Sequence, residues 1–120
     1  MTTAANLLVI AAGLANAKPQ FSKTDMYRNQ KLLRAVASLP CQHCGLDGQT
    51  QAAHANWSWS GKGMGIKAHD VFVCALCQSC HYMIDQGKDL QRWEREEIWM
   101  KAWRQTMFEL FTRGLVDVRT

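Results

Sequence analysis

The sequence has no apolar run long enough to cross a bilayer, no internal repeat and no low-complexity tract. Its longest apolar stretch, NLLVIAAGLANA, ends in Ala15-Asn16-Ala17, which resembles a signal-peptidase site. No Lys or Arg precedes this stretch, so the positive region of a secretory signal is missing. We therefore expect a short helix or strand packed on the domain, with a signal peptide as the alternative.

A complete disulfide framework is also excluded, because the chain has five cysteines. Four of them form two Cys-x-x-Cys pairs, Cys41/Cys44 and Cys77/Cys80, which together are the ligand set of a structural zinc site. No βαβ unit surrounds either pair, which disfavours a thioredoxin-like redox site. Cys74 lies in an apolar run and is expected to be a buried free thiol. Metal-bound cysteines indicate a reducing compartment, the cytoplasm.

The length of 120 residues fits a single domain. A helix is predicted from Ser22 or Thr24 to Ser38, where Pro40 ends it. Its apolar positions are Met26, Leu32, Leu33 and Val36, and its basic stripe is Arg28, Lys31 and Arg34. This stripe is interpreted first as a solvated helix face and second as a DNA contact.

The middle of the chain predicts two strands, around TQAAHA and DVFVCAL, joined by the glycine-rich loop NWSWSGKGMGIK. A second helix is predicted from about Asp89 to Arg113, with Gly114 as the residue that ends it. One apolar face of this helix is interpreted as core: Trp93, Met100, Trp103, Met107, Leu110 and Phe111.

These elements predict an α+β domain over residues 1–120 with three parts. Residues 1–39 form an N-terminal flanking segment and helix, residues 40–88 the zinc-stapled core, and residues 89–120 the C-terminal helix and tail.

The stretch CALCQSCHYMID contains more metal-ligand side chains than one tetrahedral ion accepts. If Cys80 opens a helix, His81 points about 100° away from it. Asp85 lies one turn after His81, so the two share a face on which nitrogen and carboxylate ligands suit Mg²⁺, Mn²⁺ or Zn²⁺. We therefore predict a second, open metal site. His54 is a candidate base for activating water there, because an imidazole has a pKa of about 6.5; the alternative is a structural histidine.

A histidine-bearing strand, a loop, a second strand and a helix opening Cys-x-x-Cys-His resemble the ββα-metal, or His-Me finger, pattern of HNH nucleases. More closely, AAHANWSWSGKGMGIKAHDVFVCALCQSCHYMIDQGK resembles a family of small phage and prophage proteins classed with these nucleases. The similarity covers about Pro40 to Lys88.

The resemblance implies metal-dependent hydrolysis of DNA phosphodiester bonds in the bacterial host cytoplasm, in phage recombination or DNA processing, with host or phage recombination proteins as partners. It implies that His54 is the general base and that His81 and Asp85 hold the catalytic Mg²⁺ or Mn²⁺, with Zn²⁺ as an alternative.

The sequence departs from the HNH pattern at two positions. Many of these nucleases have a metal ligand immediately before the base, where this chain has Ala53. The usual middle Asn is best matched by Asp70, which would either complete the metal shell or orient His54. Asn56 is a second candidate for the orienting role.

The glycine-rich loop lacks the G-K-[ST] of a P-loop. Lys62 and Lys67 are interpreted as phosphate contacts, with a solvated loop as an equal alternative, and Asn56 is a further candidate for a nucleic-acid contact. Trp57 and Trp59 are expected to pack under the loop; base stacking is the second interpretation.

The sequence is compatible with three functions. We expect an endonuclease first. A non-catalytic zinc module that binds nucleic acid is second, and an interaction adaptor that uses its Trp-rich helix is third.

Overall fold

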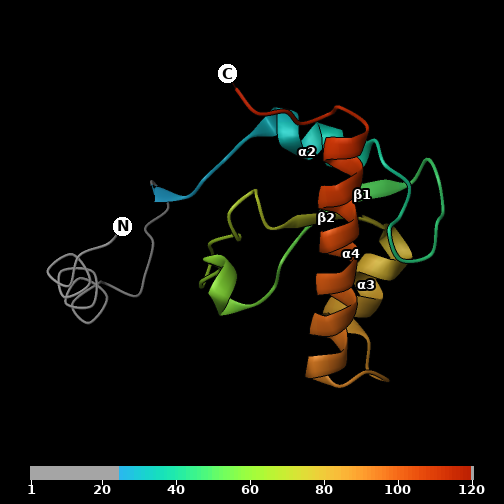
Figure 1. Cartoon of the computed structure of the whole chain (residues 1–120). Helices are drawn as coiled ribbons and strands as arrows, with labels where there is room; N and C mark the ends of the chain where they lie inside the picture. The colour runs from blue at the N-terminus through green and yellow to red at the C-terminus, as the bar shows by residue number, and fades with distance from the viewer. Residues whose placement is uncertain (1–24, 120) are drawn as a thin grey trace, which may run out of the picture.

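A computed structural model describes residues 25–119 of the chain. The stretch NLLVIAAGLANA and the predicted helix start at Ser22 or Thr24 lie outside the described residues. The elements follow one another along the chain (Figure 1) as helix α2 (Gln30–Ala37), strand β1 (Thr50–His54), the 3-10 helix η2 (Ser58–Ser60), strand β2 (Val73–Cys77), helix α3 (Gln78–Gln86) and helix α4 (Arg92–Thr112).

The two predicted strands are confirmed, and they form an antiparallel pair. Thr50 lies opposite Cys77, and His54 lies opposite Val73. Every residue of β2 is buried, whereas Ala53 is the one buried residue of β1. Because successive side chains of a strand point to opposite faces, His54 lies on the face opposite to Ala53 and is partly exposed.

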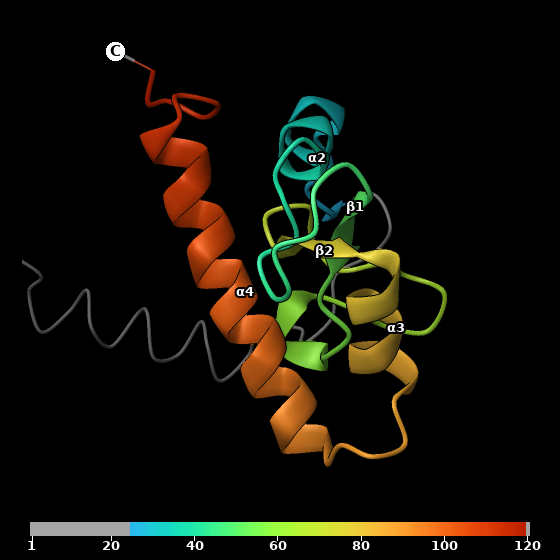
Figure 2. The same ribbon diagram turned by 90° about the vertical axis from the view of Figure 1, so that its right-hand side faces the viewer.

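Three helices cover this small sheet. Helix α4 crosses β2, while α2 and α3 lie on opposite sides of the sheet in both views (Figures 1 and 2). The result is the predicted α+β architecture: two antiparallel strands followed by helices, with the cysteine pairs at the point where β2 passes into α3.

Helix α4 confirms the predicted C-terminal helix, but the predicted core face is correct only in part: Leu110 is buried, and Met100, Trp103 and Met107 are partly buried against the core. The buried residues of α4 are Trp99, Ala102, Thr106 and Leu110. At 100° per residue their face is centred about a quarter turn from the predicted stripe. Trp93 and Phe111 of that stripe are 70% and 53% exposed.

The small side chains at the centre of α4 explain this rotation. Ala102 allows the helix to approach β2 closely, and Thr106 satisfies a backbone donor of that strand. The N–H of Ala75 donates to the Thr106 hydroxyl at 3.0 Å, and the hydroxyl donates to the Ala102 carbonyl at 2.7 Å. A buried N–H without a partner would be destabilising, so this hydrogen bond selects the face.

Helix α2 begins later than predicted, at Gln30, because Asn29 caps it. The Asn29 side chain accepts from the Leu32 N–H at 3.0 Å while its own backbone is extended. Met26 and Arg28 therefore precede the helix and are not part of its faces. Among residues 25–119, no helix is both long and apolar enough to cross a membrane.

Candidate functional site

The four cysteines of the two Cys-x-x-Cys pairs meet in space. The sulfur atoms of Cys41, Cys44, Cys77 and Cys80 all lie within 4.8 Å of one another. The sulfurs of Cys44 and Cys77 are 3.6 Å apart. Tetrahedral zinc with Zn–S bonds of 2.3 Å requires sulfur separations of about 3.8 Å. The cluster is therefore compatible with a structural zinc ion.

The first knuckle has the local geometry that thiolate ligands need. The N–H of Cys44 donates to the sulfur of Cys41 at 3.4 Å, and the N–H of Gly45 donates to the carbonyl of Cys41 at 2.9 Å. Gly45 has φ +84°, a left-handed conformation that closes the turn at little steric cost. The 32 residues between the pairs contain β1, η2 and most of β2, which bring the second pair back to the first.

The ionisation of these thiols also suits a bound cation. Burial disfavours the thiolate of Cys41, but backbone N–H groups of Cys44 and Cys77 point at its sulfur and on balance lower its pKa to about 6. Burial raises the pKa of Cys80, and the neighbouring thiols raise it further. Four adjacent sulfurs cannot all be negative without a positive charge among them. The donor set fits a thiophilic divalent ion.

Cys74 is a free thiol in the core, as predicted. It is fully buried in β2, and burial raises its pKa. In the sheet, Cys74 lies opposite Ala53. In the sequence, it precedes Cys77 by three residues.

His54 and Asp70 form a hydrogen-bonded pair next to the sheet. Nε2 of His54 is 2.7 Å from Oδ1 of Asp70. The carboxylate can only accept, so Nε2 carries the proton and Nδ1 carries the lone pair. Within residues 25–119, no group forms a hydrogen bond with this Nδ1. The His54 side chain is 20% exposed, which leaves the lone pair accessible from the cleft.

Asp70 is held by two residues that the sequence interpretation did not connect with it. Arg28 contacts Oδ1 at 3.3 Å, and the N–H of Asn29 donates to Oδ2 at 2.7 Å. Both oxygens of this buried carboxylate are therefore occupied by protein donors. Of the two roles considered for Asp70, this geometry favours orienting His54 over binding a metal. Arg28 was assigned to a solvated helix stripe, so no sequence pattern pointed to this contact.

His81 and Asp85 face each other one turn apart on α3. Nε2 of His81 is 3.1 Å from Oδ2 of Asp85, and Nδ1 of His81 is 2.9 Å from Oε1 of Gln51 on β1. The Gln51 oxygen accepts the Nδ1 proton, so Nε2 faces the carboxylate as an N–H donor in the protonated ring and as a lone pair in the neutral ring. Two acceptors this close need a proton or a cation between them. A ligating His whose other nitrogen donates to an oxygen is typical of metal sites.

One cleft of about 530 Å³ joins these groups. Its lining includes the predicted site residues His54, Asn56, Lys62, Lys67, His81 and Asp85. Ala53 is buried on the opposite face of β1 and offers no ligand there. Asp70 does not line the cleft, but it is hydrogen-bonded to His54, which does.

The tryptophans of the loop mainly pack, as predicted. Trp57 is buried and contacts Trp99 of α4 edge to face, with ring centroids 6.0 Å apart. Trp59 is half exposed, lies parallel to Trp57 and donates its Nε1–H to Glu96 at 3.0 Å. These contacts attach the loop to α4.

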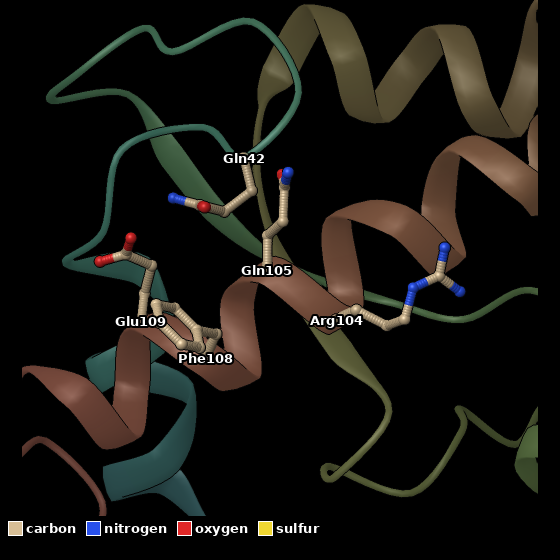
Figure 3. A pocket seen from close by; sticks show the side chains of 5 residues that line it. All are labelled: Gln42, Arg104, Gln105, Phe108 and Glu109. Atoms are coloured by element: carbon tan, nitrogen blue, oxygen red, sulfur yellow. The ribbon is translucent and has the colours of Figure 1, made fainter.

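A second hollow, of about 420 Å³, lies along the C-terminal half of α4. It is lined by Gln42, Arg104, Gln105, Phe108 and Glu109 (Figure 3). None of these is a His or Cys. Arg104 points away from Phe108 and Glu109, and it is 4.0 Å from Glu97. We assign no chemistry to this hollow.

The fold and the site define a small α+β protein with a four-cysteine cluster compatible with zinc and an adjacent histidine- and aspartate-lined cleft. The chain belongs to the family described as "Protein of unknown function (DUF968)", whose model matches residues 17–110. No curated protein and no solved structure is significantly similar to it.

Proposed function

We propose that this protein is a metal-dependent DNA endonuclease of the HNH type. The observation that supports this proposal best is that two metal-ligand atoms on α3, His81 Nε2 and Asp85 Oδ2, lie 3.1 Å apart in the same cleft as His54. With the ring neutral, both atoms would be free to bind a cation. His54 would then lie beside it with a free lone pair.

In this proposal His54 is the general base. Asp70 holds its ring in the tautomer that leaves Nδ1 unprotonated, and this nitrogen takes a proton from the attacking water. The charge of Asp70 also stabilises the imidazolium that results. Since Arg28 and Asn29 fix both oxygens of Asp70, the ring has little freedom to turn away from the cleft.

His81 and Asp85 would hold a divalent ion such as Mg²⁺ or Mn²⁺, with Zn²⁺ as an alternative. When bound, this ion would stabilise negative charge on the scissile phosphate and on the leaving oxygen. Gln51 fixes the ring of His81 so that Nε2 faces Asp85, where the two side chains would hold the ion. The four-cysteine cluster would staple β2 and α3 to the first knuckle, which keeps His81 in place.

The main alternative is a zinc module that binds nucleic acid without cutting it. The cleft would then be a binding groove, and the contact between His81 and Asp85 would be a protonated ion pair. The absence of a ligand side chain at Ala53 favours this alternative, because a metal ion in the cleft would have only two protein ligands, both from α3.

Incubation of the purified protein with plasmid, single-stranded and branched DNA in Mg²⁺ or Mn²⁺ separates the two functions. A nuclease converts at least one substrate to nicked or shortened products, and product formation stops when the divalent ion is omitted. Salt-dependent binding without any product would select the zinc module.

Lys62→Ala and Lys67→Ala are expected to weaken DNA binding equally for all sequences. Both lysines line the cleft, and each lost phosphate contact should lower the slope of log K against log salt by about 0.7–0.9. Fluorescence anisotropy over a salt series measures this slope. Lys101→Ala is the control, because Lys101 is exposed on α4 and lines no part of the cleft. A changed sequence preference with an unchanged slope would contradict a phosphate contact.

A further inference from the structure

A smaller cavity of about 160 Å³ lies next to the cleft, between α3 and the start of α4. It is lined by Asn56, Trp57, Ile84, Arg92 and Arg95. Two of these five residues are arginines, and no residue of the lining is acidic. Within the part of the chain that the structure describes, neither arginine forms an ion pair with a carboxylate.

Arg95 has an unused donor at this position. Its NH1 group donates to the backbone carbonyl of Asp85 at 3.2 Å, which fixes the guanidinium against α3. Its Nε–H is buried and has no hydrogen-bond partner. Buried donors without partners are rare in folded proteins, so the guanidinium of Arg95 has hydrogen-bonding capacity left beside this cavity. The group that fits a guanidinium edge is an oxyanion.

The surroundings of Arg95 strengthen this preference for an anion. Trp57 and Ile84 are buried and form apolar walls, where a charge interaction is less screened than in water. Arg92 is exposed at the first position of α4, where the helix dipole also favours negative charge. Glu94 is the acidic residue in this turn, and its side chain is bound to the N–H of Gln91.

The cavity adjoins the proposed catalytic cleft through two residues. Asn56 lines both cavities. Asp85 directs its carboxylate toward His81 in the cleft, while its backbone carbonyl accepts from Arg95. A strand with one phosphate in the cleft can therefore place a neighbouring phosphate against Arg92 and Arg95.

We propose that Arg92, Arg95 and Asn56 form a binding site for a backbone phosphate of DNA, next to the scissile phosphate that the proposed cleft would hold. The position of that second phosphate rests on the proposed nuclease function, but binding at the arginines does not require cleavage. This site extends the contact surface from the loop lysines across α3 to the start of α4.

The test is DNA binding by Arg92→Ala and Arg95→Ala, measured by anisotropy with labelled single-stranded and duplex oligonucleotides in Ca²⁺. Each variant should bind about tenfold more weakly, as expected for a lost charged hydrogen bond. The salt slope should fall by about 0.7 for single strands and 0.9 for duplexes. Arg104→Ala is the matched control, because Arg104 lies on the same helix but lines the hollow of Figure 3.

Unchanged affinity and slope in Arg92→Ala would overturn the proposal. Arg92 is exposed, so this variant decides the question even if Arg95→Ala fails to fold. Weaker binding by Arg104→Ala to the same degree would also overturn it, because the effect would then come from the loss of any positive charge.

If the wild type cuts DNA and the arginine variants bind normally, this inference alone fails. If the wild type binds without cutting and the variants bind weakly, the nuclease proposal fails and the phosphate site remains. A wild type that does not bind DNA refutes both.

Discussion

Replacement of Cys41 by Ser is expected to prevent zinc binding at the four-cysteine cluster and to unfold the core. Structural zinc contributes on the order of 10 kcal/mol to folding in small modules. The net stability of an ordinary domain is only about 5–15 kcal/mol, so loss of one thiolate removes most or all of it. The core has little to replace this contribution, because its sheet has two strands and the cysteine cluster joins the first knuckle to β2 and α3.

Metal analysis of the gel-filtered protein and thermal unfolding by circular dichroism measure the two effects of Cys41→Ser. Cys74→Ala is the matched control. It removes a buried thiol three residues from Cys77, and it should lower stability by only about 1 kcal/mol while zinc content stays at one ion per chain. An unchanged zinc content in Cys41→Ser would show that the four sulfurs are not the ligands.

Under the proposed function, His54→Ala and His81→Ala should both abolish measurable DNA cleavage, but for different reasons. His54→Ala removes the base, a loss of about 10²–10⁴-fold in rate, while His81 and Asp85 remain to hold the ion. His81→Ala removes a ligand, so its activity should return in part when the Mg²⁺ or Mn²⁺ concentration is raised. A metal titration of cleavage rate for both variants separates the two roles.

Both histidine variants should keep the zinc and the fold, because neither histidine belongs to the cysteine cluster and both side chains are partly exposed. Ser79→Ala provides a control on the same helix, at an exposed position that lines neither the main cleft nor the hollow beside His81 and Asp85. Loss of zinc from His81→Ala would place His81 in the structural site. Recovery of His54→Ala, but not of His81→Ala, at high metal concentration would reverse the assigned roles.

The sequence alone determined the features that depend on local spacing. Two Cys-x-x-Cys pairs predict two knuckles and one four-sulfur cluster, and the structure brings all four sulfurs together. The strand-like segments TQAAHA and DVFVCAL predict the two strands, and both strands are present. His81 and Asp85 share a face because helical geometry sets an i,i+4 pair, whatever the rest of the chain does.

Only the tertiary structure decided which distant residues support these local units. Asp70 meets His54 because the loop returns to β1, and Arg28 reaches Asp70 because the chain before α2 is extended. Arg95 leaves a buried donor beside α3 only because α4 packs where it does. The buried face of α4 likewise depends on a tertiary contact, because Thr106 must face β2 to accept the hydrogen bond from the N–H of Ala75. Such contacts depend on the relative placement of whole elements, and periodicity within one element contains no information about that placement.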